Sequence, residues 1–179
     1  MHGRGFIDVL VPRGSASLIE TVVTESTVPV IETGAGNVHI LLDASAPEDW
    51  AVDIVVNAKT QRPSVCNTVE TVLVHRSAAA RLVPTVVTAL QDRGVTVHGD
   101  PSIAELASGV VPATDADWDT EYLSLDIAMR VVDSLDDALE HIRAHSTGHT
   151  ESIISTDARN IDRFLAEVDS AVVMANAST

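Results

Sequence analysis

The chain has 179 residues, and its 11 Lys and Arg against 26 Asp and Glu give a formal net charge of −15 at pH 7. A surface this acidic repels phosphate backbones and anionic lipid headgroups, so we expect neither a nucleic-acid partner nor a role at a membrane surface. Apolar residues make up 45% of the chain but aromatic residues only 3%, which predicts a domain folded around an aliphatic core.

Apolar residues recur along the chain with periods of 2 and 3.6, separated by turn residues, which is typical of an α/β domain. The pattern predicts strands over residues 6–11, 29–31, 38–42, 69–74, 95–98, 127–132, 152–155 and 171–174. It predicts helices over residues 17–26, 45–59, 77–90, 102–107, 136–145 and 158–168. Three of these helices each lie between two strands, which favours a mainly parallel sheet flanked by helices.

Helix termini and one loop are also predicted. Ser45 has the spacing of a capping box with Glu48, and Ser77 and Ser134 are expected to cap the next long helices. Gly94 is expected just beyond the end of the helix that Ser77 begins, and residues 115–120 should form an acidic loop.

Cys66 is the single cysteine, which excludes an intramolecular disulfide and any CxxC zinc or redox motif. The apolar stretch at residues 6–11 is too short and polar for a secretory signal, and no apolar run reaches the length of a membrane-spanning helix. The sequence therefore predicts a soluble, cytoplasmic protein in a reducing compartment.

Cys66 lies in the most polar and irregular part of the sequence, residues 57–71. A catalytic thiol must be available as thiolate, which nearby cations favour, and Lys59 and Arg62 precede Cys66 by a few residues. A lone cysteine is also often an inert, buried residue. From the residues alone, both interpretations of Cys66 remain open.

Five motifs carry a resemblance to a known family. They are Val-Pro-Arg-Gly at 11–14, Pro-Val-Ile-Glu-Thr-Gly-Ala-Gly-Asn at 29–37, Lys-Thr-Gln-Arg-Pro-Ser-Val-Cys-Asn at 59–67, Glu-Tyr-Leu-Ser-Leu-Asp at 121–126 and Asn-Ala-Ser-Thr at 176–179. Together, in this order and spacing, they resemble the gamma-glutamyl phosphate reductases of proline biosynthesis, in the aldehyde dehydrogenase superfamily. The resemblance covers essentially the whole chain and implies the fold of an aldehyde-dehydrogenase-like catalytic domain.

The resemblance implies an NADPH-dependent reduction of gamma-glutamyl phosphate to glutamate 5-semialdehyde, with release of phosphate. Cys66 would attack the acyl phosphate and form a thioester, and its backbone N–H would stabilise the oxyanion. By the same resemblance we expect a homo-oligomer and a possible association with glutamate 5-kinase.

The resemblance also implies roles for other residues. Asn67, Asn176, Ser178 and Thr179 are expected to bind the substrate. Lys59 and Arg62 lie close enough to Cys66 in sequence to attract the acyl phosphate or the departing phosphate, and the alternative is that they are solvated loop cations. Those expected near the cofactor are Glu121, which would contact the nicotinamide ribose, Glu32 and Gly34. Glu32 is expected to be structural or close to the cofactor rather than a base, because hydrolysis of a thioester would be wasteful in a reductase.

The chain also departs from the family pattern, because most of the family's cofactor domain has no counterpart in it. We expect residues 1–33 to be a remnant of that domain and residues 34–179 to be the catalytic domain, truncated at its C-terminus. The isolated chain should therefore bind NADPH weakly or not at all and show no turnover.

Two other functions compete with the reductase. A cysteine-dependent amidohydrolase would need an imidazole close to the sulfur, from His39, His75 or His98. A non-catalytic binding or assembly module would instead keep Cys66 buried and unreactive. A metal site is not expected, although His141, His145 and His149 follow one another at intervals of four residues.

Overall fold

The computed structural model describes residues 3, 5–32 and 35–179. The chain divides into two compact units, Met1–Ala35 and Gly36–Thr179, and each is described by itself. None of the helices in the described part of the chain has the length and apolar character needed to cross a membrane.

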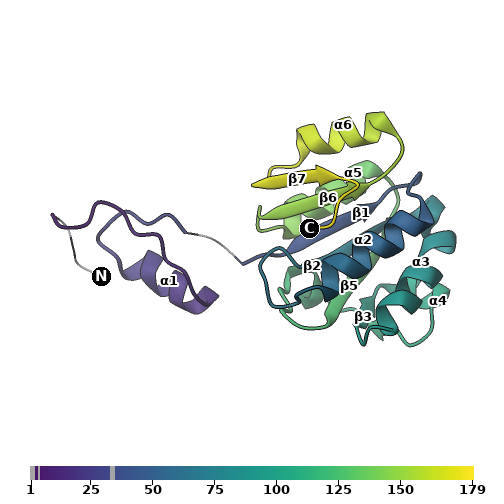
Figure 1. Cartoon of the computed structure of the whole chain (residues 1–179), viewed down its shortest axis with the longest axis horizontal. Coiled ribbons are helices and arrows are strands. Elements are labelled where there is room, and N and C mark those ends of the chain that lie inside the picture. The colour runs from purple at the N-terminus through teal and green to yellow at the C-terminus, as the bar shows by residue number, and fades with distance from the viewer. Residues whose placement is uncertain (1–2, 4, 33–34) are drawn as a thin grey trace. The chain divides into compact units, whose positions relative to one another are not determined.

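The larger unit is built on a seven-stranded sheet in the order β4-β3-β5-β2-β1-β6-β7, with every described pair of strands parallel (Figure 1). Its strands are β1 (Val38–Leu42), β2 (Val69–His75), β3 (Thr96–Gly99), β4 (Val111–Pro112), β5 (Asp126–Val132), β6 (Thr150–Ile154) and β7 (Val172–Ala175). The predicted α/β class with a mainly parallel sheet is therefore confirmed. Only the two-residue strand β4 has no counterpart in the sequence prediction.

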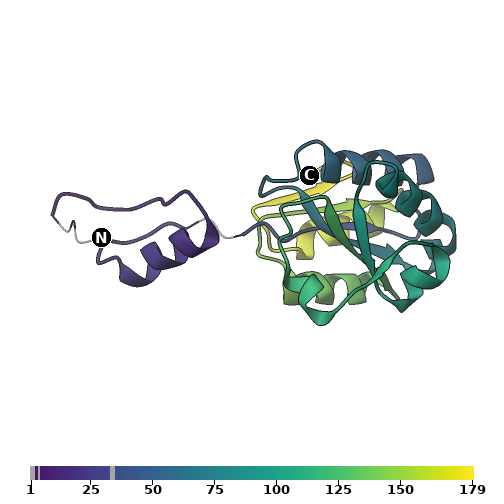
Figure 2. The same cartoon turned by 90° about the horizontal axis from the view of Figure 1, so that it is seen from below.

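Helices cover both faces of this sheet (Figures 1 and 2). One face packs against α2 (Glu48–Thr60), α3 (Arg76–Gln91) and α4 (Pro101–Leu106), and the other against α5 (Leu135–His145) and α6 (Ala158–Glu167). Strand β1 is apolar at most positions because Ile40 and Leu42 face the first set of helices and Leu41 faces the second. The acidic segment expected as a loop forms the 3-10 helix η1 (Asp115–Asp119).

Two of the predicted helix caps are wrong. The Ser45 hydroxyl does not cap α2, whose N-cap is Pro47; it binds the Ser155 hydroxyl (2.9 Å) and accepts from the Thr156 amide (2.9 Å). Helix α3 begins earlier than predicted, with the His75 ring accepting from the amide of Ser77. Helix α2 thus begins without a side-chain cap, and at α3 the cap is the His75 ring instead of Ser77.

The other two predictions at helix termini agree with the structure. Ser134 caps α5 by accepting a hydrogen bond from the Asp137 amide. Gly94 follows α3 with a positive φ of 76°, which a glycine adopts without the strain of a side chain.

The smaller unit contains α1 (Ala16–Glu25), capped by Ser15 as its hydroxyl accepts from the Leu18 amide. The strands predicted over residues 6–11 and 29–31 are wrong, because in the described part of this unit they meet only in one isolated parallel bridge, Leu10 with Val30. A strand pair is marginal without a third strand or a helix to cover its apolar face, and Phe6 is 96% exposed.

Candidate active site

Three segments that carry predicted site residues precede strands β1, β2 and β5. Gly36 precedes β1, Cys66 precedes β2 and Glu121 precedes β5. Because parallel strands begin at the same edge of a sheet, these segments meet there. The sequence placed these residues 30 and 55 positions apart, and the topology brings them into contact.

Cys66 is exposed, in the loop that joins α2 to β2. Thr68 fixes this loop, since its hydroxyl donates to the Arg62 carbonyl (2.8 Å) and its amide donates to the Val65 carbonyl (3.0 Å). The Cys66 amide donates no hydrogen bond to any described residue. Cys66 is thus exposed, its backbone N–H has no partner among the described residues, and the expectation of a buried cysteine is wrong.

Gly36 is the residue that joins Glu121 to the Cys66 loop. A Cβ at Gly36 would lie 1.7 Å from the backbone oxygen of Cys66, so a side chain there would collide with the loop. The Gly36 amide donates to Oε1 of Glu121 (2.7 Å), and Glu121 Oε2 has no partner among the residues described. One oxygen of this half-buried carboxylate therefore remains free to accept a hydrogen bond.

The two cations near Cys66 have different surroundings. The Arg62 side chain is exposed and forms no ion pair within the described chain, so it can meet an incoming anion. The Lys59 side chain is fully buried, with Nζ 2.5 Å from Glu70 Oε2. Lys59 thus faces the protein interior instead of the solvent from which a phosphate would arrive, and its contact with the substrate stays a prediction.

Burial shapes the ionisation of this pair. Desolvation lowers the pKa of the Lys59 amine, and the charge of Glu70 opposes that change. Desolvation likewise raises the pKa of Glu70 to about 7, although Lys59 and the Leu123 amide both stabilise its charged form.

Asn176 and the last two residues of the chain, all expected at the substrate, lie in different places. Asn176 has a φ of 55°, and its side chain accepts from the Ser155 amide (2.9 Å) and donates to the Ser155 carbonyl (3.0 Å). Ser155 follows the C-terminal end of β6, so Asn176 lies at the edge of the sheet opposite Cys66. Both polar atoms of the Asn176 side chain thus bind the Ser155 backbone, and its contact with the substrate stays a prediction.

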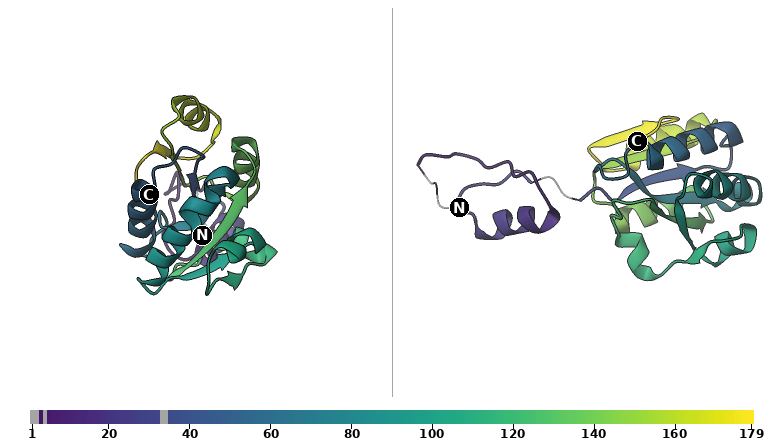
Figure 3. Two further views of the ribbon diagram at one scale, coloured as in Figure 1. Left: turned by 90° about the vertical axis from the view of Figure 1, so that its right-hand side faces the viewer. Right: turned by 60° about the horizontal axis from the view of Figure 1, so that its bottom comes forward.

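After Asn176 the chain turns back toward the edge that carries Cys66, and Figure 3 shows the C-terminus beside α2. The Ser178 hydroxyl donates to Asn57 Oδ1 (2.8 Å), and the Thr179 carbonyl accepts from Gln61 Nε2 (3.5 Å). Asn57 lies in the last turns of α2, and Gln61 is the C-cap of that helix. Ser178 and Thr179 are therefore fixed beside the helix that leads into the Cys66 loop.

The remaining predicted residues make few contacts. Asn67 is half-buried, and its side chain forms no hydrogen bond with the described part of the chain. Glu32 is exposed in the smaller unit, and Gly34 lies outside the described residues.

The histidines proposed as bases all lie close to groups other than the Cys66 sulfur. His39 is buried with Nδ1 3.2 Å from Glu151 Oε2, His75 contacts the Ser77 hydroxyl, and His98 contacts Asp126 at 3.0 Å. None of the three has a described contact with Cys66. The amidohydrolase therefore finds no imidazole partner for the sulfur in the described structure.

Of the three histidines at four-residue intervals, two have neighbouring rings and the third bonds elsewhere. His141 and His145 have ring centroids 4.5 Å apart, and His149 Nδ1 contacts the Thr150 hydroxyl (2.8 Å). Within residues 3, 5–32 and 35–179, no three His, Cys, Asp or Glu side chains are arranged to hold a metal ion.

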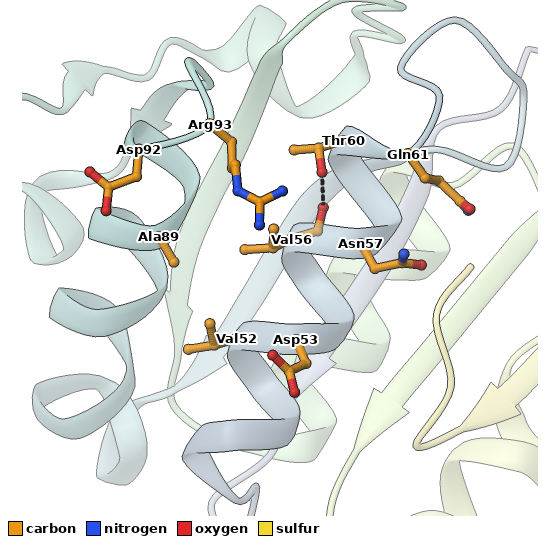
Figure 4. Close-up of a pocket in the computed structure, with 9 residues that line it drawn as sticks. All are labelled: Val52, Asp53, Val56, Asn57, Thr60, Gln61, Ala89, Asp92 and Arg93. Atoms are coloured by element: carbon orange, nitrogen blue, oxygen red, sulfur yellow. Dashed lines mark hydrogen bonds between the residues drawn. The ribbon is translucent and has the colours of Figure 1, made fainter.

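A groove of about 550 Å³ runs between α2 and α3, with Asn57 and Gln61 on its wall (Figure 4). Arg93 reaches into it from the end of α3, while Asp53 and Asp92 contribute two carboxylates. The two negative charges against one positive charge make this groove a poor site for an anion.

Glu70 is the important residue that the sequence prediction missed. Lys59 lies four residues after Val55, on the buried side of α2, and Glu70 lies two residues before Val72, on the face of β2 that α2 covers. A lysine and a glutamate at core-facing positions of adjacent elements indicate a buried ion pair, and this pattern could have been found in the sequence.

Comparison with known proteins adds the family context. No protein-family model matches the chain. The whole chain is 64% identical to gamma-glutamyl phosphate reductase of Clavibacter michiganensis subsp. michiganensis, covering 41% of that protein. The structure of gamma-glutamyl phosphate reductase from Thermotoga maritima matches with a TM-score of 0.95 and 47% identity, over 98% of this chain and 42% of that one.

More distant structures share the fold alone. An acetylating aldehyde dehydrogenase from Geobacillus thermoglucosidasius matches with a TM-score of 0.72 at 20% identity, over 99% of this chain and 48% of that one. The aldehyde-dehydrogenase-like fold and the resemblance to gamma-glutamyl phosphate reductases are thus confirmed. The chain spans about two fifths of the length of the curated relatives that it matches.

Proposed function

We propose that this chain supplies the nucleophile of a gamma-glutamyl phosphate reductase, an NADPH-dependent enzyme of proline biosynthesis in the cytoplasm. One observation carries the proposal: an exposed Cys66, with an unpaired backbone N–H, lies on a loop that packs against Gly36 beside the Glu121 carboxylate. The similarity of the whole chain to enzymes of this name supports the choice of substrate.

The proposed chemistry begins with acyl transfer to sulfur. The Cys66 thiolate attacks the acyl carbon of gamma-glutamyl phosphate, and the unpaired Cys66 N–H donates to the oxyanion that develops. The carbonyl re-forms as the bond from carbon to the phosphate oxygen breaks, and phosphate leaves with the electron pair. The exposed guanidinium of Arg62, which has no ion pair among the described side chains, stabilises the charge of the leaving phosphate.

Asn67 is proposed to bind the substrate directly, since its half-buried amide has no hydrogen bond in the described chain. Ser178 and Thr179 are proposed to line the amino-acid side of the site from their position beside the end of α2. A nicotinamide cofactor, when bound, supplies the hydride that reduces the thioester to the aldehyde. The free oxygen of Glu121 fits a ribose hydroxyl, and Glu32 and Gly34 are proposed to lie near the same cofactor.

Residues 1–33 are proposed as part of a cofactor-binding domain and residues 34–179 as the catalytic domain. Because Glu121 is the one described cofactor candidate in the larger unit, we expect this chain alone to bind NADPH weakly or not at all and to show no turnover. Self-association and association with glutamate 5-kinase are proposed for the longer protein.

Phosphate release tests the proposal on the chain itself. Mixed with gamma-glutamyl phosphate generated in situ, the chain should release up to one equivalent of phosphate in a burst and then stop, because the thioester is not reduced. The Cys66→Ser variant should show no burst. Equal release by both proteins above the spontaneous rate would contradict the proposal.

A further inference from the structure

A fully buried ion pair, Lys59 with Glu70, lies at the two ends of the segment that carries Cys66. Lys59 lies in the last turn of α2, seven residues before Cys66, and Glu70 is the second residue of β2, four residues after it. Both side chains have an exposed fraction of 0%, and their charged atoms lie 2.5 Å apart. This ion pair therefore joins the two ends of the segment that carries the thiol.

Glu70 also holds the segment that precedes β5. Its second oxygen, Oε1, accepts a hydrogen bond from the Leu123 amide (3.3 Å), and Leu123 has a φ of 55°, which is uncommon for a leucine. Lys59 Nζ lies 5.8 Å from the centroid of the Tyr122 ring, within range of a cation–π contact. The pair thus contacts residues 122 and 123 of this segment, and Glu70 accepts from the amide of Leu123, the residue with the unusual φ.

The segment contacted in this way leads back to the thiol. Glu121, next to Tyr122, accepts from the Gly36 amide, and Gly36 lies against the Cys66 carbonyl. The contacts form a closed circuit that runs from Lys59 to Glu70, through residues 121–123 to Gly36, and on to the Cys66 loop. We call these contacts the Cys66 circuit.

We propose that Lys59 and Glu70 are positioning residues, which set the geometry of the Cys66 loop and of the Glu121 carboxylate together. This inference rests on the proposed function only in taking Cys66 as the nucleophile. An apolar pair of similar size is often as stable as a buried ion pair, so stability alone gives little reason for charges here. The reason that we propose is directional: the charged pair makes contacts at defined positions to the end of α2, to β2 and to residues 122–123.

Hydrogen exchange of backbone amides, measured by NMR on the intact chain, tests the inference without any assay of activity. In Glu70→Gln the Leu123 amide should lose its charged acceptor, and the Gly36 amide, which does not touch Glu70, should exchange at least about tenfold faster. The Thr68 amide in the Cys66 loop should also exchange faster. The matched control is Glu151→Gln, which alters another fully buried strand glutamate that lies outside the circuit and accepts from the His39 amide.

A second variant guards against unfolding of the first, because Glu70→Gln leaves a buried amine without its counter-charge. Lys59→Met combined with Glu70→Met removes both charges and keeps the volume, and it should give the same faster exchange at Gly36. The inference is overturned if either folded variant accelerates only Leu123, or if Glu151→Gln accelerates Gly36 equally. The phosphate burst tests whether Cys66 is the nucleophile, and hydrogen exchange tests whether Lys59 and Glu70 position its loop. Either result can fail without the other.

Discussion

The Cα of Gly36 lies so close to the backbone carbonyl of Cys66 that a methyl group on it would come within 1.7 Å of the oxygen. The contact joins the segment that enters β1 to the loop that enters β2, at the edge of the sheet where the proposed chemistry occurs. Because backbone meets backbone, neither side can rotate away from a clash as a side chain could.

Gly36→Ala should therefore move the Cys66 loop. We expect a loss of about 1–3 kcal/mol in the free energy of unfolding, as for other overpacked sites, measured by urea denaturation. The phosphate burst should fall with it. Gly94→Ala is the control, because nothing lies within 4 Å of a Cβ there and only its positive φ carries a cost. If Gly36→Ala behaves like Gly94→Ala in both measurements, the contact has no effect on the loop.

Arg62→Ala should slow the phosphate burst by about 10- to 100-fold, the value of one charge-assisted hydrogen bond to the leaving phosphate. Alkylation of Cys66 by neutral iodoacetamide, which reports the reactivity of the thiolate itself, should slow much less than the burst, because that reaction releases no phosphate. Arg93→Ala is the matched control, since this side chain also has no ion pair among the described residues but lies between α2 and α3. If both variants slow the burst equally, the loss of one positive charge anywhere on the chain would explain the effect, and Arg62 would not contact the leaving phosphate.

Asn176→Ala should lower the free energy of unfolding more than Asn176→Gly does. Both variants lose two hydrogen bonds to the Ser155 backbone, at a cost of about 1–2 kcal/mol, and only alanine adds strain at a φ of 55°. Urea denaturation measures this order. A smaller loss with alanine than with glycine would show that the backbone is not held in the left-handed region.

His141 should make the fold less stable in acid. Burial, with the nearby charges of His39, His145 and Arg130, lowers the pKa of His141 to about 3. The unfolded chain binds this proton below about pH 6.5, so stability falls as the pH falls below that value, by up to about 1.4 kcal/mol per pH unit.

The variant His141→Gln carries no charge at any pH and isolates this effect. Between pH 7 and pH 5 the wild-type chain should lose about 2 kcal/mol more than the variant, measured by urea denaturation at each pH. Parallel curves for the two proteins would show that His141 is protonated as easily in the fold as in the unfolded chain.

The sequence predicted most of the fold because its periodicity is strong. The near-continuous apolar run at β1 and the spacing of Ala51 and Val55 on α2 leave little choice of element. The cap of α2 was missed because the tertiary structure brings Ser155 to the Ser45 hydroxyl, and the cap of α3 was missed because the ring of His75, two residues before Ser77, accepts from the Ser77 amide. The strands predicted near Leu10 and Val30 failed because periodicity does not show which segments find a partner.

The site was predictable only in part. Cys66, Gly36 and Glu121 were found as motifs, but their contacts depend on the order of the strands. Lys59 was assigned to the substrate because it lies near Cys66 in sequence, whereas its position on the buried side of α2 directs it to Glu70.

The most direct test of the central claim is the covalent state of Cys66 itself. Intact-mass and peptide-mapping mass spectrometry of the chain, quenched in acid after mixing with gamma-glutamyl phosphate, should show one glutamyl group on the peptide that carries Cys66, removable by hydroxylamine. Release of phosphate without an acyl group on Cys66, or an acyl group at another residue, would contradict the account.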